Sequence, residues 1–299
     1  MSHLRLATRR SPLAVAQAER VALLLQRHNV TSEIVLLDSQ GDRDLTTPLR
    51  EIAGAGVFAV EIQRAVLEGR ADLAVHSAKD LPSDTPEGLT LASVPEREDP
   101  RDVLVGTSLA GLGPGATVAT GSPRRRAVLL ERRPDLNIVE LRGNMERRLA
   151  SVHERGIDAI VTAAAALVRL GQEDQIAEFL DPQWCIPQVG QGALAIEARS
   201  DDTLALAAAA ALNDQEAWRC VMTERAFLRE LGAGCSIPAA AHARRVGVDY
   251  EISGIMAAVD GSRVLRATHQ GHLPDEVGRR LAIILRDELG GGELEGWSS

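Results

Sequence analysis

A lysine beside an aspartate, at the end of an apolar segment, is the first pair of side chains that could do chemistry. Residues 72–76 have the composition of a β-strand, and Ser77, Lys79 and Asp80 follow in a loop. Lys79 is the only lysine in the chain, which suggests a primary amine that arginine could not replace. The pair could be a plain surface contact. It could also bind an anion next to a carboxylate that stabilises positive charge, or the amine could form a Schiff base.

Two glycine-bearing turns contain further candidate residues. Cys235 lies in the run Gly-Cys-Ser-Ile-Pro after a predicted helix, and a cysteine on such a turn is a candidate nucleophile or covalent attachment point. The other cysteines, Cys185 and Cys220, are expected to be inert packing residues. No cysteines have the spacing of a zinc or redox site, so no metal is expected. The second turn, residues 189–193, has two glycines that would allow close approach of the backbone to a ligand.

Arginines gather between Thr120 and Arg148. Eight arginines and four acidic residues give this stretch a charge of +4, in a chain whose formal net charge is −9. Arg124 and Arg125 fall in the first turn of a predicted helix, where cations oppose the helix dipole, so an anion is expected nearby. The alternatives are a solvated helix face, a ligand with several carboxylates or phosphates, and single-stranded nucleic acid. Nucleic acid is disfavoured because no aromatic residue lies in this stretch to stack on bases.

The predicted elements would carry these residues to strand ends. Strands are expected at 3–8, 33–38, 72–76, 116–120, 137–141, 157–162 and 193–198, and helices from Ser11, near 58–68, over 123–133 and from about 145. One device occurs twice, a strand ending in Ala-Thr followed by Ser-Pro opening a helix. Each copy directs a helix N-terminus at a strand end, which suits an anion. Two such α/β units facing one another would form a cleft.

The C-terminal part of the chain has a different pattern. Helices are expected at 201–212 and 214–231, strand-like segments at 246–258 and 263–269 with an Asp260-Gly261 turn between them, and a last helix over 275–289. This order predicts a small α+β domain after the two α/β units.

Composition limits the classes of function. A length of 299 residues indicates two or three domains. No apolar run approaches the ~20 residues of a membrane-spanning helix, and the first residues lack a signal-peptide core, so a cytoplasmic location is expected. The negative net charge argues against a nucleic-acid or anionic-membrane partner. Three widely spaced cysteines fit a reducing compartment.

Taken together, the segments resemble the porphobilinogen deaminases along nearly the whole chain. The motifs that carry the resemblance are, in order, LATRRSPLA, HSAKDLPS, EREDPRD, ERRPDL, LRGN, DAIVTAAAALVRLG, VGQGA and GAGCSIP. The resemblance implies an α/β fold with two periplasmic-binding-protein-like domains joined by a hinge, and a small α+β C-terminal domain. The implied boundaries are 1–95 with 194–212 for domain 1, 96–193 for domain 2 and 213–299 for domain 3.

The same resemblance implies an activity. The family condenses four porphobilinogen molecules head to tail, with loss of ammonia, onto a dipyrromethane cofactor, and then releases hydroxymethylbilane for heme biosynthesis. It implies a thioether between the cofactor and Cys235, a small-molecule substrate as the partner, and a monomer.

The resemblance also implies roles for individual residues. Asp80 would be the catalytic aspartate, which hydrogen-bonds a pyrrole N–H and stabilises the cation left by loss of ammonia. Carboxylates of the cofactor would be held by Ser77, Lys79, Thr120, Ser122, Arg124, Arg125, Arg142 and Arg148. The substrate side would include Arg9, Ser11, Gln191, which would line the cleft, and Phe58, which would shield it.

The sequence departs from the family's pattern in the first domain. Basic residues common at three positions are replaced here by Gln40, Ala55 and Val60. These losses suggest an alternative, a divergent paralogue that binds a pyrrole or another carboxylate ligand with little or no turnover.

Overall fold

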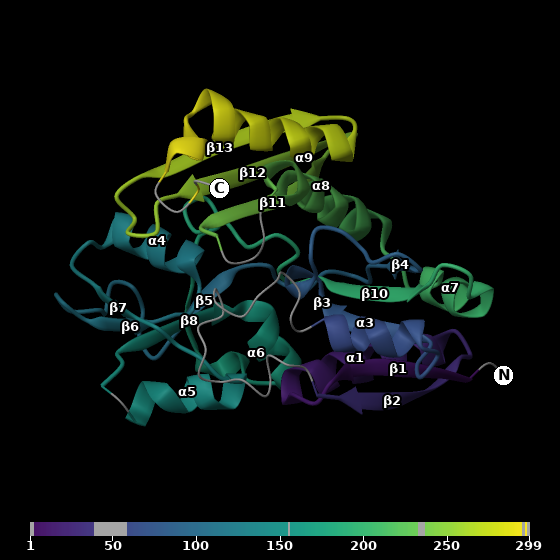
Figure 1. Cartoon of the computed structure of the whole chain (residues 1–299). Helices are drawn as coiled ribbons and strands as arrows, with labels where there is room; N and C mark the ends of the chain where they lie inside the picture. Colours follow the sequence, from purple (N-terminus) through teal and green to yellow (C-terminus); the bar gives the residue numbers. More distant parts are fainter. Residues whose placement is uncertain (1–2, 39–58, 155, 233–236, 295–296, 298–299) are drawn as a thin grey trace.

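A five-stranded mixed sheet forms from the first segments of the chain and from one strand that comes much later (Figure 1). The computed structural model describes residues 3–38, 59–154, 156–232, 237–294 and 297. The sheet has the order β2-β1-β3-β10-β4, with β1 His3–Arg9, β2 Thr31–Leu37, β3 Leu73–Ser77, β4 Leu89–Ser93 and β10 Leu194–Arg199. Its helices are α1 (Pro12–Arg27), α3 (Val60–Leu67) and α7 (Thr203–Ala210).

A second five-stranded sheet repeats this plan. Its order is β7-β6-β8-β5-β9, with β5 Asp102–Val105, β6 Thr117–Ala119, β7 Asn137–Val139, β8 Ala159–Ala163 and β9 Ile176–Phe179. Its helices are α4 (Pro123–Arg132), α5 (Met145–Glu154) and α6 (Ala164–Leu170). In both sheets the second strand is parallel to both neighbours, and the fourth is antiparallel to the strands beside it. The short sequence repeat is therefore a repeat of topology.

The chain crosses between the two sheets twice. Residues 94–101 lead from β4 to β5, and residues 180–193 lead from β9 back to β10. The fourth strand of each sheet therefore adjoins a crossover. Any side chain near residues 100 or 190 lies where the two sheets meet.

Apolar side chains cover both faces of each large sheet, as expected when helices pack on both sides. On the first sheet, α1 and α7 cover one face through residues such as Val21 and Ala205, and α3 covers the other through Ile62. On the second sheet, α5 and α6 cover one face and α4 covers the other. Burying one large apolar side chain stabilises the fold by about 1.5–3 kcal/mol.

A smaller third unit lies against the other two, at the top of Figure 1. It has an antiparallel sheet of order β11-β12-β13, with β11 Ala239–Val246, β12 Asp249–Ala257 and β13 Val264–Gly271. Helices α8 (Gln215–Leu231) and α9 (Pro274–Ile283) pack on this sheet, and a π-helical turn, Ile284–Glu288, extends α9. Ala240 and Ile255 contact the core beside α4. The fold class expected from the sequence, two α/β units and a small α+β unit, is confirmed.

Several element predictions were incomplete or wrong. The strand expected at 246–258 is β12, which starts at Asp249 because the chain turns back at Gly247, and the strand before that turn, β11, was not predicted. β11 is rich in alanine and arginine, which favour helix in isolation, so tertiary packing overrides propensity there. Strands β4, β5 and β9 and helix α6 were not predicted. β5 has four residues, all buried, so it shows no alternation of apolar and polar positions.

Within the described ranges, no helix is both long and apolar enough to cross a membrane.

Candidate active site between the two large sheets

The predicted site residues lie at strand ends and helix starts, as the sequence suggested. β3 ends at Ser77 and continues into a 3-10 turn, Ala78–Asp80, which carries Lys79. β1 ends at Arg9, and Thr120 follows the end of β6 directly. Ligands of open α/β sheets bind outside the carboxyl ends of the strands, so this edge is where a ligand is expected.

The two predicted helix starts are confirmed. Ser11 caps α1, because its Oγ accepts from the Ala14 amide at 3.4 Å, and Ser122 caps α4 by accepting from the Arg125 amide at 3.4 Å. The Thr120 hydroxyl oxygen accepts from the Ser122 amide at 3.2 Å. These three hydroxyl groups therefore organise the helix starts, and their contacts with a ligand stay a prediction.

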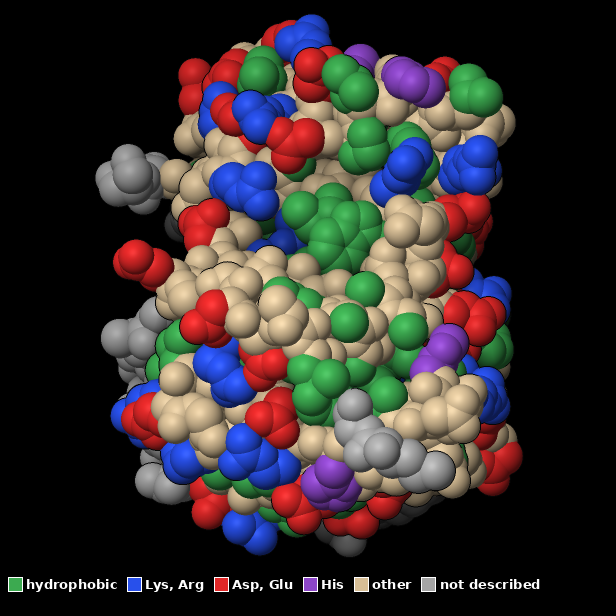
Figure 2. All heavy atoms as spheres, turned by 90° about the vertical axis from the view of Figure 1, so that its right-hand side faces the viewer, with side chains coloured by type: hydrophobic (Ala, Val, Ile, Leu, Met, Phe, Trp, Pro, Cys, Tyr) green, Lys and Arg blue, Asp and Glu red, His purple; other side chains and the backbone are tan. Residues whose placement is uncertain are grey.

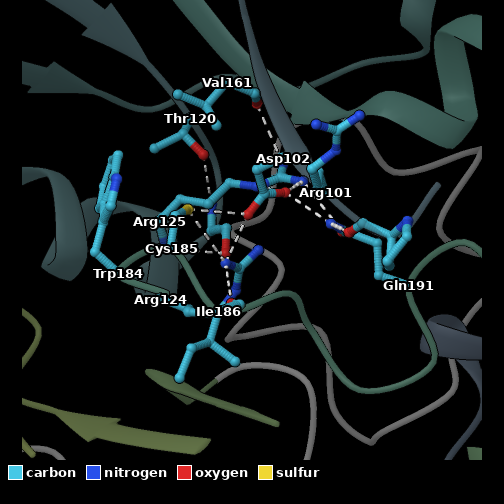
Figure 3. A network of polar contacts seen from close by, with 12 residues as sticks. Arg101, Asp102, Thr120, Arg124, Arg125, Val161, Trp184, Cys185, Ile186 and Gln191 are labelled. Carbon is cyan, nitrogen blue, oxygen red and sulfur yellow. Dashed lines mark hydrogen bonds and ion pairs between the residues drawn. The ribbon is translucent and has the colours of Figure 1, made fainter. Parts of the chain in front are cut away.

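A buried carboxylate that sequence reasoning missed, Asp102, holds the first two arginines of α4 (Figure 3). Its Oδ2 lies 2.7 Å from Arg124 Nη1, and its Oδ1 lies 2.7 Å from Arg125 Nη2. Burial raises the pKa of this carboxyl, but the two guanidinium groups outweigh burial and hold the pKa well below its usual range. Asp102 is therefore ionised at neutral pH.

The first two arginines of α4 are not part of a solvated helix face. Arg124 is 2% exposed and Arg125 is 7% exposed. Arg124 Nη1 donates to the Ile186 carbonyl at 2.8 Å, and Arg125 Nη1 donates to the Val161 carbonyl at 3.2 Å. Among the residues the structure describes, Nε and Nη2 of Arg124 are buried and have no hydrogen-bond partner. Two nitrogens of this guanidinium are thus unpaired within the described residues, while the third is fixed by the protein.

Gln191, predicted to line the cleft, contacts other predicted site residues, and its contact with a ligand stays a prediction. Its side chain is fully buried in the second crossover. Nε2 donates to the Pro100 carbonyl at 2.7 Å and to Asp102 Oδ1 at 2.8 Å. Oε1 accepts from Lys79 Nζ at 3.3 Å and from Arg125 Nη2 at 3.3 Å. The amide therefore joins a cation from the first sheet to a cation from the second.

The glycines beside Gln191 differ from their prediction. Gly190 and Gly192 have φ angles of 72° and 84°, which disfavour other residues. A Cβ on Gly190 would lie 2.9 Å from the Lys79 amide nitrogen, and one on Gly192 would lie 2.3 Å from the Glu98 carbonyl oxygen. The glycines allow close approach to protein backbone, of the Lys79 turn and of the first crossover, and not to a ligand.

Lys79 is half-buried beside Asp80 and the α4 arginines. Burial, reinforced by the positive charge of Arg125, lowers its pKa to about 8, against the opposing effect of Asp80 and Asp102. The amine is thus close to balance between its charged and neutral forms at neutral to mildly alkaline pH.

The predicted basic residues gather around Asp80. Burial lowers the pKa of Arg148 to about 10. The positive charges of Arg125, Arg9 and Arg142 lower this pKa further, and the negative charge of Asp80 opposes the decrease. These residues come from both large sheets and lie close enough for the charge of one to change the pKa of another. The arrangement has more cations than anions, which suits a ligand with several carboxylates.

Two more buried carboxylates were not predicted from the sequence. Glu197 in β10 lies 3.1 Å from His76 Nε2 and accepts from Gln63 Nε2 at 2.9 Å, directly behind the end of β3. Glu224 in α8 forms a bidentate pair with Arg97 of the first crossover, at 2.7 and 3.1 Å. A single acidic residue in an otherwise apolar strand was the available signal for Glu197.

Some predicted residues fall outside the described part of the chain. These are the expected attachment residue Cys235, the expected shielding residue Phe58, and two of the positions that lack a common basic residue, Gln40 and Ala55. The third such position, Val60, opens α3 and is 55% exposed.

The described ranges contain no group of three or more His, Cys, Asp or Glu side chains that could hold a metal ion.

Known proteins are similar to this chain over most of its length. Residues 4–207 match the family model "Porphobilinogen deaminase, dipyromethane cofactor binding domain", and residues 218–287 match "Porphobilinogen deaminase, C-terminal domain". The porphobilinogen deaminase of Pelobacter propionicus is 43% identical over 93% of each chain. That of Bacillus subtilis is 41% identical over 96% of this chain and 94% of its own. That of Syntrophotalea carbinolica is 46% identical over 89% of this chain and 86% of its own.

Solved structures show weaker similarity. The methionine-binding protein MetQ is 15% identical, covers 72% of this chain and 92% of its own, and has a TM-score of 0.46. A periplasmic substrate-binding protein from Coxiella burnetii is also 15% identical, covers 72% and 94%, and has a TM-score of 0.43.

Proposed function

This chain belongs to the porphobilinogen deaminase family and is a hydroxymethylbilane synthase, and we propose that its chemistry takes place among the cations around Asp80. The reaction condenses four porphobilinogen molecules head to tail, with loss of one ammonia at each addition, and releases hydroxymethylbilane. The observation that carries the proposed location is the gathering of Asp80 with Lys79, Arg125 and Arg148 from two different sheets.

The residues of this site fit the dipyrromethane cofactor of the family. A dipyrrole with acetate and propionate groups needs several cations. The site supplies an excess of them, together with two buried Arg124 nitrogens that lack a partner within the described residues. We propose that Arg124, Arg125, Lys79 and Arg148 hold its carboxylates, with Arg142, Ser77, Thr120 and Ser122 nearby. The cofactor supplies the primer to which the first unit is joined.

Asp80 is the proposed catalytic residue. Its carboxylate would accept a hydrogen bond from the pyrrole N–H of the incoming porphobilinogen. When the aminomethyl group loses ammonia, the remaining cation is stabilised by that negative charge in a half-buried site. Arg9 and Ser11, at the end of β1 and the start of α1, are the proposed substrate-side residues.

Cys235 is the proposed attachment point of the cofactor, through a thioether. Its support is the resemblance of GAGCSIP to the family's cysteine loop, and the chemistry of the other two cysteines. Burial raises the pKa of both Cys185 and Cys220, the latter to about 12, so neither is an available thiolate.

The domain boundaries, the cellular location and the partners are proposed from the resemblance to the family. We propose domain 1 as residues 1–95 with 194–212, domain 2 as 96–193 and domain 3 as 213–299. We also propose a cytoplasmic monomer that takes a small-molecule substrate and no nucleic acid. On the face seen in Figure 2, acidic and basic side chains are intermingled and form no continuous basic surface. The paralogue without turnover is not favoured, because relatives at 41–46% identity over most of the chain are porphobilinogen deaminases.

The test uses intact mass and product formation. Purified enzyme should be heavier than its polypeptide by one dipyrrole, and incubation with porphobilinogen should add further pyrrole units and release bilane. Asp80→Asn should keep the dipyrrole and lose bilane release by about 100-fold or more, because the charge that stabilises the cation is gone. Cys235→Ala should have the bare polypeptide mass. Normal turnover by Asp80→Asn would contradict the proposed site.

A further inference from the structure

Asp102 is placed where it can influence the site without touching a ligand. It is fully buried, and both of its oxygens are occupied by protein groups. Oδ1 accepts from Arg125 Nη2 at 2.7 Å, Arg125 Nε at 3.0 Å and Gln191 Nε2 at 2.8 Å. Oδ2 lies 2.7 Å from Arg124 Nη1 and accepts from Cys185 Sγ at 3.3 Å. No acceptor position is left for a substrate.

Asp102 also decides which way the Gln191 amide faces. The two hydrogens of Nε2 are used by two acceptors, Asp102 and the Pro100 carbonyl. Oε1 must therefore face the other way, where it accepts from Lys79 and Arg125. The reversed amide would place a donor against two cations and an acceptor against a carboxylate and a carbonyl, so it is excluded on charge.

This hydrogen-bonded chain spans the junction of the two sheets. Lys79 follows β3 of the first sheet, Arg125 lies in α4 beside the second, Gln191 is in one crossover, and Asp102 starts β5 after the other. Figure 3 shows the hydrogen bonds and ion pairs that link Arg125, Asp102 and Gln191. The spacing of the Lys79 amine and the Arg125 guanidinium is set by one amide oxygen.

We propose that Asp102 is a positioning residue for the deaminase reaction, acting through Gln191 to hold Lys79 and Arg125 at a fixed spacing across the junction of the two sheets. Its negative charge also partly neutralises the cluster and so favours the protonated form of Lys79 beside Arg124 and Arg125. This proposal rests on the proposed function of the site and adds to it a residue that never meets the substrate.

The single lysine gives a readout that needs no activity. Reductive methylation with ¹³C-formaldehyde labels one side chain, Lys79, together with the N-terminal amine, and NMR follows the Lys79 signal through a pH titration. In holoenzyme carrying Asp102→Asn, the Lys79 midpoint should move to lower pH than in wild type, because an opposing charge is lost. On unlabelled enzyme, kcat/KM for porphobilinogen should fall about 10- to 100-fold from misplaced cations.

Asp72→Asn is the matched control. Asp72 precedes β3, at the opposite end from Lys79, and pairs with Arg5 at 2.8 Å and Arg199 at 3.8 Å. The same substitution at a carboxylate that also pairs with two arginines should leave the Lys79 midpoint and kcat/KM unchanged. A folded Asp102→Asn enzyme with the wild-type midpoint and wild-type kcat/KM would overturn the proposal.

A second variant decides the matter if Asp102→Asn does not fold. Gln191→Met keeps the length of the side chain and the charge of Asp102, and removes only the amide bridge. The proposal expects a lower Lys79 midpoint, because a hydrogen bond to the charged amine is lost, and a decrease in kcat/KM of about tenfold or more. Unchanged values for both would overturn it. Because the titration does not depend on turnover, failure here is distinguishable from failure of the proposed function.

Discussion

At the scale of single residues, the site is a balance of unequal charges. Asp102 and Asp80 are the anions among Lys79, Arg125 and Arg148 and their basic neighbours. Asp102 is fully engaged by protein groups, and Asp80 is half-buried. The excess of positive charge therefore suits a ligand with several carboxylates. Of these cations, Lys79 has the pKa nearest to neutral pH, at about 8.

Lys79 predicts a pH dependence of substrate capture. Its pKa of about 8 means that the ammonium form is lost as pH rises through that value. If Lys79 binds a carboxylate, kcat/KM for porphobilinogen should fall about tenfold between pH 7 and pH 9. Lys79→Arg should remove this alkaline decrease, because a guanidinium stays charged. An identical decrease in wild type and Lys79→Arg would exclude Lys79 as its source.

The same group affects stability with a definite sign. The folded pKa of about 8 lies below the ordinary value of 10.5, so between these values the unfolded chain binds more protons. The contribution of Lys79 to the free energy of unfolding should therefore increase as pH rises from about 8 to 10.5. The site carries this unfavourable contribution at pH 7, as expected of a group selected for binding.

At the scale of elements, each large sheet directs one Ser-Pro helix start towards its strand ends. The serine hydroxyls accept from backbone amides, and the prolines occupy positions where no amide hydrogen is needed. The start of α4 also carries Arg124 and Arg125, whose charges oppose the helix dipole. Asp102 at the start of β5 compensates both, so this helix start depends on the strand that follows the first crossover.

Capping by Ser122 should be measurable apart from ligand binding. Ser122→Ala should lower the free energy of unfolding by about 1 kcal/mol, because the Arg125 amide loses its acceptor. Ser122→Asn should restore most of that stability, since asparagine is an equally good capping residue. Urea unfolding measures both variants. If alanine and asparagine were equally stable, the hydroxyl would have no capping role.

At the scale of the whole molecule, one carboxylate joins the third unit to both crossovers. Glu224 of α8 is fully buried, pairs with Arg97 of the first crossover, and accepts from the Gly190 amide of the second at 2.7 Å. It also accepts from the Ala243 amide of β11 at 2.9 Å. Burial raises its pKa, but Arg97 and then His242 outweigh burial and lower the pKa to about 2.

Glu224→Gln should therefore weaken the whole assembly at neutral pH. Removing one partner of a buried pair costs about 3–5 kcal/mol, because the Arg97 charge stays buried without compensation. The folded pKa of Glu224 is lowered from 4.5, so its contribution is present above pH 4.5 and lost as pH falls towards 2. The difference in free energy of unfolding between wild type and variant should shrink over that range.

A matched control is available in the same pair of units. Arg266 of β13 and Glu131 of α4 also form an arginine–glutamate pair between the third unit and the rest, with side chains 30% and 34% exposed. Because the pair is partly solvated, Glu131→Gln should cost less than about 1 kcal/mol. Equal losses for the two variants, by urea unfolding at pH 7, would show that burial of Glu224 is not the cause.

The amino-acid sequence by itself determined the family, the fold class, the two Ser-Pro helix starts and most strands, because ordered motifs and local periodicity are properties of contiguous residues. It also indicated which strand ends would carry Lys79, Asp80 and the arginines. The tertiary structure alone revealed Asp102, Glu197 and Glu224, each of which pairs with residues far away in the chain.

Gln191 shows why the rest needed tertiary structure. The family resemblance suggested that it lines the cleft, and only the structure shows its amide buried between cations that lie 112 and 66 positions away in sequence. Burial and hydrogen-bond partners across such distances depend on how the two sheets are joined by their crossovers. Local sequence does not determine that arrangement, because the same polar side chain can face solvent, a ligand or another segment of the chain.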